Sequence, residues 1–380
     1  MARLGDVATY VNGFAFKPSD WSDKGLPIIR IQDLTGNSYQ ANRYNGEYHP
    51  KYEVNDGDVL ISWSASLGVY IWKGEKAVLN QHIFKVVFDK VEVDTSFFVH
   101  QVQNILENAA SEAHGATMKH LTKPVFDALL FYLPNIEKQK EIATVLDKVG
   151  ELITLRKEQL AKLDQLVKSR FIELFGDPVS NPMGWDMPLI EDVVAKEKNA
   201  LKAGPFGSAL KKEYYVSSGY KIYGQEQVIS GDHTFGDYYI DEERYQALQN
   251  CAVQAGDVLI SLVGTYGKLL VMPEEFEPGI INPRLMKITF DKKKVNPYYF
   301  QYYFQSDSLK KALAENTHGG TMDILNLGIV RKLAMPVPPL ELQDAFITFV
   351  EQTNKSKLSI QKSLNKLELL KKSLMQEYFG

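Results

Sequence analysis

The sequence predicts an α+β protein with two mixed α/β domains joined by two long helices, which pack as an antiparallel coiled coil with pseudo-two-fold symmetry. Three observations support this prediction. The chain repeats itself, each repeat begins with short β-type runs separated by turns, and each repeat ends in a long stretch without proline. At 380 residues the chain is long enough for two such repeats, each with its own core.

The repeat consists of short motifs that recur in the same order at a slowly drifting offset. Gly57–Ser62 (Gly-Asp-Val-Leu-Ile-Ser) recurs at 256–261, an offset of 199, and Leu79–Lys85 is echoed by 281–287, an offset of 202. An offset of 204 relates three further pairs: His114–Met118 with 318–322, Pro134 and Gln139 with Pro338 and Gln343, and Phe175–Gly176 with 379–380. Nearer the start, Gly13–Lys17 ahead of Gly25 parallels Gly207–Lys211 ahead of Gly219, at an offset of 194. Such drift indicates two diverged copies with small loop insertions.

The first part of each copy is rich in short β-type runs with Gly, Asn and Asp turns between them. We expect strands within 26–31, 58–62 and 83–88, and within 258–261 and 285–290. Short helices should follow Asp94 and Asn296, which are good N-caps, and Pro297 suits the first helical position.

The second part of each copy predicts one long helix. Residues 137–175 contain no proline, and apolar residues recur every seven positions from Leu146 to Leu174. Residues 341–379 also lack proline and place Val350, Lys357, Leu364, Lys371 and Tyr378 at the corresponding positions. Polar breaks alternate, because Arg156 corresponds to Ile360 and Lys357 to Ile153. Such seams favour two helices that pack together and leave surface for a further partner; two independent surface helices are the alternative.

These patterns divide the chain into five segments. We expect a first domain over 1–136, a long helix over 137–176, a linker over 177–187, a second domain over 188–340 and a second long helix over 341–380. The Gly-Asp-Pro run at 176–178 provides the expected helix stop.

Composition excludes several classes of protein. No apolar run approaches the roughly 18 residues that cross a bilayer, and Met1–Val7 shows no secretory signal, so we expect a cytoplasmic protein. The net charge of −4 argues against a protein that coats DNA nonspecifically. The lone Cys251 excludes an internal disulfide and is expected to be a small buried side chain.

Duplication itself suggests a function. A protein with two-fold symmetry suits duplex DNA, whose backbone has the same symmetry, and the helices would then set the distance between two half-sites. The copies differ most clearly at 28–33 against 222–227. Each domain should therefore read a different short sequence, and the DNA site should be split and asymmetric.

At these motifs the chain resembles the specificity subunits of Type I restriction-modification enzymes over nearly its whole length. The matching motifs are the Gly-Asp-Val-Leu-Ile-Ser strand, the Gly-x-Thr-Met turn, the Pro-x-x-x-x-Gln helix entry and the opening at 203–212. The second helix entry departs from the first, since Asp344–Phe346 replaces Lys140–Ile142. That departure could alter contacts with partners.

The resemblance implies a non-catalytic subunit with one target-recognition domain for each half of a bipartite duplex site. It would recruit two methyltransferase subunits that use S-adenosylmethionine to modify adenine, and, in the complete enzyme, two restriction subunits that use ATP and Mg²⁺. No cofactor or metal is expected in this chain. The alternatives are a two-headed structural adaptor without sequence-specific DNA binding and a self-contained methyltransferase.

Asn296-Pro-Tyr-Tyr resembles the loop with which adenine methyltransferases grip a flipped base, but it lacks the second proline. Its counterpart, Asp94-Thr-Ser-Phe-Phe98, indicates a helix cap followed by core aromatics instead. The recurring His114 and His318 have no nearby ligands in sequence and are expected to mark tight turns.

Base-edge and phosphate contacts require Arg, Lys, Asn, Gln, His or hydroxyl side chains in loops. The DNA-binding candidates in the first copy are Lys17, Arg30, Gln32, Arg43, Thr117, Lys119 and His120. Those in the second copy are Ser208, Lys211, Lys212, Gln225, Lys268, Arg284 and Thr321. The alternative for each candidate is an ordinary solvated side chain. For the Gly-x-Thr-Met residues the alternative is a structural turn.

Overall fold

A computed structural model describes residues 1–36, 42–64, 66–112, 122–262, 268–315 and 325–380. The chain forms two compact units, the first made of 1–158 and 360–380 and the second of 159–359. Each unit is a mixed α and β domain with parts of both long helices, so the predicted α+β class is confirmed. The division differs from the predicted segments in that each long helix belongs half to one unit and half to the other.

In its described residues the first unit contains three small sheets and four α-helices ahead of the long one. One sheet has the strand order β2-β9-β6-β7 and a second β4-β3-β8-β5, with β3 and β8 parallel; β1 pairs with β10 in the third. The strands are β1 (Ala2–Arg3), β2 (Thr9–Asn12), β3 (Leu26–Ile29), β4 (Arg43–Tyr44), β5 (Glu53–Val54), β6 (Val59–Ser62), β7 (Gly68–Ile71), β8 (Ala77–Leu79), β9 (Ile83–Val87) and β10 (Leu130–Phe131). The helices are α1 (Leu4–Val7), α2 (Ile31–Leu34), α3 (Thr95–Glu112) and α4 (Lys123–Ala128).

The second unit repeats this frame. Its sheets have the orders β11-β17-β14-β15 and β13-β12-β16, and β12 and β16 are again parallel. The strands are β11 (Leu201–Ala203), β12 (Tyr220–Tyr223), β13 (Tyr239–Ile240), β14 (Val258–Ser261), β15 (Leu269–Val271), β16 (Gly279–Ile281) and β17 (Leu285–Ile288). The helices are α6 (Ile190–Val193), α7 (Gln225–Ser230), α8 (Glu242–Ala247), α9 (Pro297–Phe304), α10 (Asp307–Glu315) and α11 (Leu327–Arg331). The predicted strands and the internal repeat are confirmed.

The recurring Gly-Asp-Val-Leu-Ile-Ser motif is a turn, an ion pair and a buried strand. Gly256 has φ +84°, which favours glycine, and β14 behind it is fully buried. The Asp257 carboxylate accepts from the Gln254 N–H at 3.0 Å and pairs with Lys287 of β17 at 3.1 Å. The first copy has the same pair at Lys85 and Asp58, 2.8 Å apart. The two recurring motifs are thus joined to each other in space.

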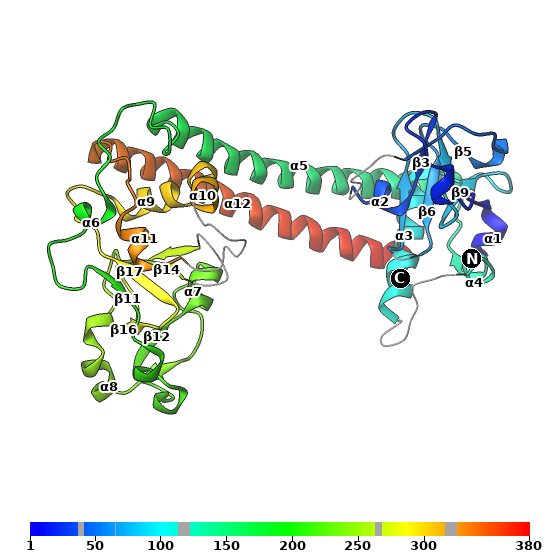
Figure 1. Ribbon diagram of the computed structural model, residues 1–380. Coiled ribbons are helices and arrows are strands. Elements are labelled where there is room, and N and C mark those ends of the chain that lie inside the picture. Colours follow the sequence, from blue (N-terminus) through cyan, green and yellow to red (C-terminus); the bar gives the residue numbers. More distant parts are fainter. Residues whose placement is uncertain (37–41, 65, 113–121, 263–267, 316–324) are drawn as a thin grey trace. The chain divides into compact units, whose positions relative to one another are not determined.

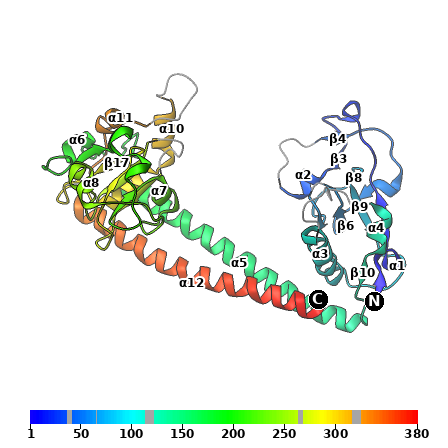
Figure 2. The same cartoon turned by 90° about the horizontal axis from the view of Figure 1, so that it is seen from below.

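The two long helices are α5 (Ile136–Phe175) and α12 (Leu340–Phe379), and they lie side by side in both views (Figures 1 and 2). In the first unit Lys157 pairs with Glu368 at 3.1 Å, and in the second Phe171 packs on Phe346 with ring centroids 5.6 Å apart. A later residue of α5 therefore meets an earlier one of α12, which is the predicted antiparallel packing. Gly176, with φ +75°, follows α5 as expected.

The predicted offset of 194 near the start of the copies is right at Lys17 and Lys211, which each precede a 3-10 turn, and at Gly25 and Gly219, which each precede a strand, but it is wrong by three residues at Gly13. The Gly13 N–H donates to the Ile83 carbonyl at 3.2 Å, and it is Gly204, not Gly207, whose N–H makes the equivalent bond, to Leu285 at 2.9 Å. A Cβ on Gly13 or Gly204 would lie within about 2 Å of the Asn80 or Asn282 carbonyl oxygen, whereas one on Gly207 would meet no described atom within 4 Å. Backbone crowding, which sequence spacing does not reveal, identifies the true counterpart.

Within the described ranges, none of the helices combines the length and hydropathy that a membrane crossing requires. Cys251 is buried as expected, and burial raises the pKa of its thiol.

Candidate nucleic-acid interface

In the second unit the structure brings two of the predicted DNA-binding residues together. Gln225 begins α7, and its side-chain amide donates to the Ser261 hydroxyl at the end of β14, at 2.8 Å. The Arg284 guanidinium donates to the side-chain oxygen of Gln225, Oε1, at 3.3 Å. Ser261 is buried, Gln225 half-buried and Arg284 exposed, so the chain of contacts leads from the core to the surface. We name Gln225, Ser261 and Arg284 the reading cluster.

The backbone beneath the reading cluster is rigid. The Asn282 side chain accepts from the Arg284 N–H at 2.9 Å, and the Asn282 N–H donates to the Tyr223 carbonyl at 2.8 Å. The turn that carries Arg284 is thereby fixed to the end of β12. A guanidinium with several donors and an amide with both donor and acceptor are the groups that pair with purine edges in the major groove.

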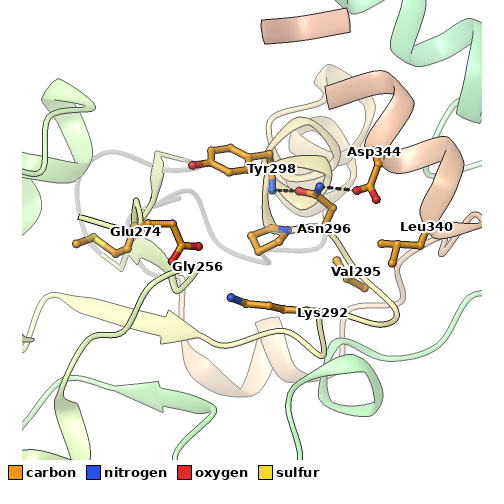
Figure 3. A pocket seen from close by; sticks show the side chains of 10 residues that line it. Gly256, Glu274, Lys292, Val295, Asn296, Tyr298, Leu340 and Asp344 are labelled. Atoms are coloured by element: carbon orange, nitrogen blue, oxygen red, sulfur yellow. Dashed lines mark hydrogen bonds between the residues drawn. The ribbon is translucent and has the colours of Figure 1, made fainter. Parts of the chain in front are cut away.

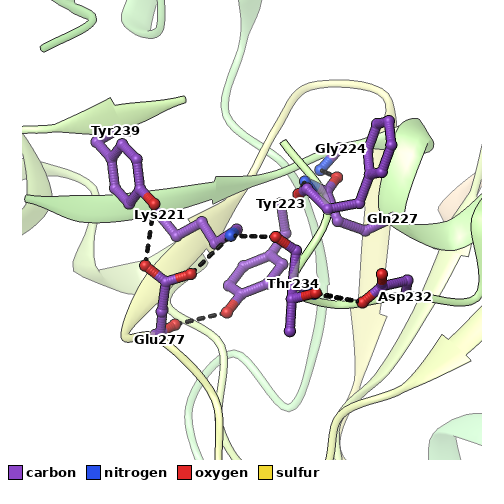
Figure 4. A network of polar contacts seen from close by, with 9 residues as sticks. Lys221, Tyr223, Gly224, Gln227, Asp232, Thr234, Tyr239 and Glu277 are labelled. Atoms are coloured by element: carbon purple, nitrogen blue, oxygen red, sulfur yellow. Dashed lines mark hydrogen bonds and ion pairs between the residues drawn. The ribbon is translucent and has the colours of Figure 1, made fainter. Parts of the chain in front are cut away.

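A polar network around the buried Lys221 of β12 is shown in Figure 4. The strand ends two residues before Gln225. The Lys221 ammonium, only 1% exposed, donates to the Glu277 carboxylate at 2.7 Å and to the Thr234 carbonyl at 2.9 Å. The Tyr239 hydroxyl donates to the other Glu277 oxygen at 3.1 Å. The Lys221 contact lowers the pKa of the Glu277 carboxyl. Because the Lys221 ammonium has hydrogen-bond partners on two other segments, the network stabilises the position of β12.

Phe206 is an exposed aromatic residue that is not among the candidates predicted from the sequence. Its backbone lies two residues after Gly204, which packs against the turn that carries Arg284. Phe206 is 89% exposed, although Pro205 before it is buried, and Gly204 is held against the turn at Asn282. A large apolar side chain exposed to water near predicted DNA-binding residues is a further candidate for a DNA contact. The glycines that flank the Pro-Phe pair were the available signal.

The remaining candidates of the second unit lie on exposed loop positions. Ser208 is in a short 3-10 turn, Lys211 caps the next one, Lys212 begins it, and Lys268 precedes β15. Thr321 lies outside the described residues.

In the first unit the same positions carry different chemistry. His82 stands where Arg284 stands in the second unit, since the Trp63 N–H donates to the His82 carbonyl as the Leu262 N–H does to that of Arg284. His82 is exposed and its ring lies 5.5 Å from that of Trp63. It was not among the candidates, although the offset of 202 places it opposite Arg284.

Four first-unit candidates differ in their surroundings. Arg30 caps α2 and lies over the Trp21 ring at 5.2 Å, and Gln32 beside it is exposed. Arg43 is engaged, because its guanidinium pairs with Glu75 at 2.6 Å and donates to the Gly25 carbonyl at 2.7 Å. Lys17 is exposed.

The other first-copy candidates, Thr117, Lys119 and His120, lie outside the described residues. In the part of the chain that the structure describes, no group of three or more His, Cys, Asp or Glu side chains is placed to hold a metal ion.

Asn296 and Asp94 act as helix caps, as predicted. Asn296 Oδ1 accepts from the Tyr298 N–H and Asp94 Oδ1 from the Phe97 N–H, each at 2.9 Å. Tyr298 is exposed, but the next aromatics in each helix, Tyr299 with Phe300 and Phe97 with Phe98, are completely buried. Both segments therefore serve as a cap and a core anchor.

A family model for the Type I restriction modification DNA specificity domain matches residues 1–165 and 183–369. The chain belongs to this family. Its similar proteins include the Escherichia coli Type I restriction enzyme EcoBI specificity subunit, 23% identical over 95% of this chain and 80% of that one. The MjaVIII specificity subunit of Methanocaldococcus jannaschii is 22% identical over 97% of this chain and 90% of that protein. The resemblance and the specificity-subunit function predicted from the motifs are confirmed at the level of the family.

Solved structures share the fold. A chain from a study of complex assembly and conformational transition of the type I restriction-modification system superposes with a TM-score of 0.61 at 16% identity, covering 100% of this chain and 96% of that one. The Type I restriction-modification S subunit from M. genitalium gives 0.55 at 13% identity, covering 100% and 95%.

Proposed function

We propose that this specificity subunit binds an asymmetric bipartite duplex DNA site, one half per domain, and is itself non-catalytic. The observation that carries the proposal is a repeated frame with different side chains at its equivalent surface positions. Arg284 and Gln225 in the second unit correspond to His82 and Ile31 in the first. The same backbone scaffold therefore presents a donor-rich cluster in one unit and different groups in the other.

Each group has a defined task in this proposal. Arg284 presents paired donors to a guanine edge, and Gln225, whose oxygen accepts from Arg284, orients it. Phe206 adds an apolar contact to the DNA beside them. The exposed Lys211 and Lys212 neutralise phosphates, which strengthens binding without selecting a sequence. With a net charge of −4 the subunit depends on its partners for much of its affinity.

The partners supply the chemistry. Two methyltransferase subunits, which bind S-adenosylmethionine, would modify one adenine in each half-site, and two restriction subunits, which use ATP and Mg²⁺, would complete the endonuclease. The two long helices provide the surface for the modification subunits.

The test begins with the sequence of methylated adenines in a host that expresses this chain with its modification subunits. A recurring split motif is expected. In a competition assay with the purified complex, a duplex carrying that motif should bind at least about a thousandfold more tightly than random duplex.

Exchange of residues 1–136 with those of another family member should change one half of the motif and leave the other intact. Equal binding to random duplex, or an unchanged motif after the exchange, would contradict the proposal; the first result would favour a structural adaptor.

A further inference from the structure

We infer that Gln139 and Gln343 are positioning residues that set the distance between the two DNA half-sites, an inference that rests on the proposed function. Each lies in the first turn of a long helix and is almost completely buried, at 1% and 0% exposed. A buried amide must satisfy its hydrogen bonds within the protein, so its position is fixed by its partners.

The Gln139 side chain ties together three pieces of the first unit. Its oxygen accepts from the Asp94 N–H at 2.9 Å, and its amide donates to the Pro134 carbonyl at 2.8 Å. Asp94 caps α3, the domain helix whose aromatics fill the core. One side chain therefore links the start of α5, the segment that enters it and the start of a helix 45 residues earlier.

The second unit uses the same device with more bonds. The Gln343 oxygen accepts from the Asn296 N–H at 2.9 Å, and its amide donates to the Pro338 carbonyl at 2.8 Å and the Lys294 carbonyl at 2.9 Å. A further bond joins the Asn296 amide to the Asp344 carboxylate at 2.8 Å (Figure 3). The equivalent of Asp344 in the first copy is Lys140, which cannot accept.

Apolar packing alone would fix the angle between each domain and the start of its long helix less precisely. Ile142 and Leu146 of α5 share a core cluster with Phe97, as Phe346 and Val350 of α12 do with Tyr299. Hydrophobic contact is not directional, whereas hydrogen bonds weaken steeply with misalignment. In the first unit Asp147 of α5 also contacts Ser96 and His100 of α3 at 2.7 Å, but the Asp147 side chain is 54% exposed and water weakens its contacts. The buried glutamines are thus the stronger constraint on the angle between each domain and its helix.

A small error in this angle has a large effect on DNA. Each helix has 40 residues and is about 60 Å long. A tilt of about 5° at one end moves the other end by about 5 Å, which exceeds the roughly 3.4 Å that one base pair occupies along the duplex. One inserted base pair also rotates a half-site by about 35°. A rigid junction should therefore reject a spacer of the wrong length.

The experiment measures spacer preference with the complete methyltransferase complex. Duplexes carry both half-sites with the native spacer or with one or two base pairs added or removed. The wild type should lose at least about tenfold in affinity for one added base pair. Gln139→Met, which keeps the volume but makes no such bonds, should reduce that loss to about threefold or less while the half-site sequences stay the same.

Three further variants complete the test. Gln343→Met should relax the spacer preference less than Gln139→Met does, because the Asn296–Asp344 hydrogen bond remains. Gln139→Glu keeps an acceptor for the Asp94 N–H, so its loss of affinity for the longer spacer should lie between those of Gln139→Met and the wild type. The matched control is Gln249→Met, at an exposed glutamine just after α8, which should change nothing.

A wild-type spacer profile in Gln139→Met overturns the inference, as does one in Gln139→Glu if Gln139→Met does not fold. Lower thermal stability with an unchanged profile also overturns it, because that result assigns the glutamines a structural role alone. A wild-type complex without any bipartite preference instead refutes the proposed function.

Discussion

Replacing Lys287 with methionine tests the electrostatic core that the two copies share. The Lys287 and Asp257 side chains are 7% and 0% exposed, and the variant leaves the Asp257 carboxylate buried without its cation. Removing one partner of such a pair costs about 3–5 kcal/mol. In the first copy Lys85 and Asp58 are 17% and 26% exposed, so solvent screens the carboxylate and Lys85→Met should cost only about 1 kcal/mol. The internal repeat therefore supplies its own control.

Hydrogen exchange followed by mass spectrometry separates the two units, which a single unfolding curve would not. In Lys287→Met, exchange in β14 and β17 should accelerate by about two to four orders of magnitude, whereas in Lys85→Met exchange in β6 and β9 should rise roughly fivefold. Lys287→Met combined with Asp257→Asn should recover most of the loss, because no buried charge remains. Equal acceleration in the two units, or no recovery in the double variant, would refute the reasoning.

Three other outcomes follow from the structure. Arg284→Ala should cost about 1–3 kcal/mol in binding and relax specificity at one base pair of one half-site, measured by competition with single-base variants; a uniform loss across all sequences would instead mark Arg284 as a phosphate contact. Gly204→Ala should lower the thermal stability of the protein because its Cβ would meet the Asn282 carbonyl oxygen at 1.9 Å, whereas Gly207→Ala should be tolerated; equal melting temperatures would contradict this. The instability of Lys287→Met should shrink as the pH falls from about 7 toward 4 in urea unfolding. Burial raises the pKa of Asp257 and the contact with Lys287 opposes that rise, so removing Lys287 raises the folded-state pKa further. The stability that the bound proton provides is present at low pH and is lost as the pH rises through the folded pKa, so protonation offsets the loss of Lys287 at low pH; a constant deficit would contradict that.

The frame of this protein could be predicted because the repeat exposes what both copies require. The Gly-Asp-Val-Leu-Ile-Ser motif keeps a positive-φ glycine, an aspartate for the ion pair and a buried strand, and each of these needs a particular residue type. The sequence shows that a glutamine recurs at each helix entry, as Gln139 and Gln343. It does not show their hydrogen bonds to Asp94 and Asn296, because these bonds span 45 and 47 residues.

The reading cluster was only partly predictable. Arg284 and Gln225 were chosen for their chemistry, yet nothing in the sequence indicated that they touch each other across 59 residues. The glycines that flank Pro205 and Phe206 indicate a turn but not that the Phe206 ring is exposed, and the Gly13 equivalence is misplaced because a loop insertion is invisible until backbone contacts are seen. The buried Lys221 runs against the expectation that lysines are solvated, and its contacts with the Glu277 carboxylate and the Thr234 carbonyl explain its burial.

The sharing of each long helix between the two units has a consequence for biosynthesis. The first unit includes 360–380, and the Phe379 ring packs 5.5 Å from that of Phe97. The ribosome makes these residues after the roughly 200 of the second unit, 159–359, a delay of about 10–40 s at ordinary elongation rates. During that interval residues 360–380 are absent, so the apolar surface around Phe97 on which Phe379 packs is exposed to solvent. A prematurely terminated chain would keep that surface open and should be a substrate for chaperones and proteases.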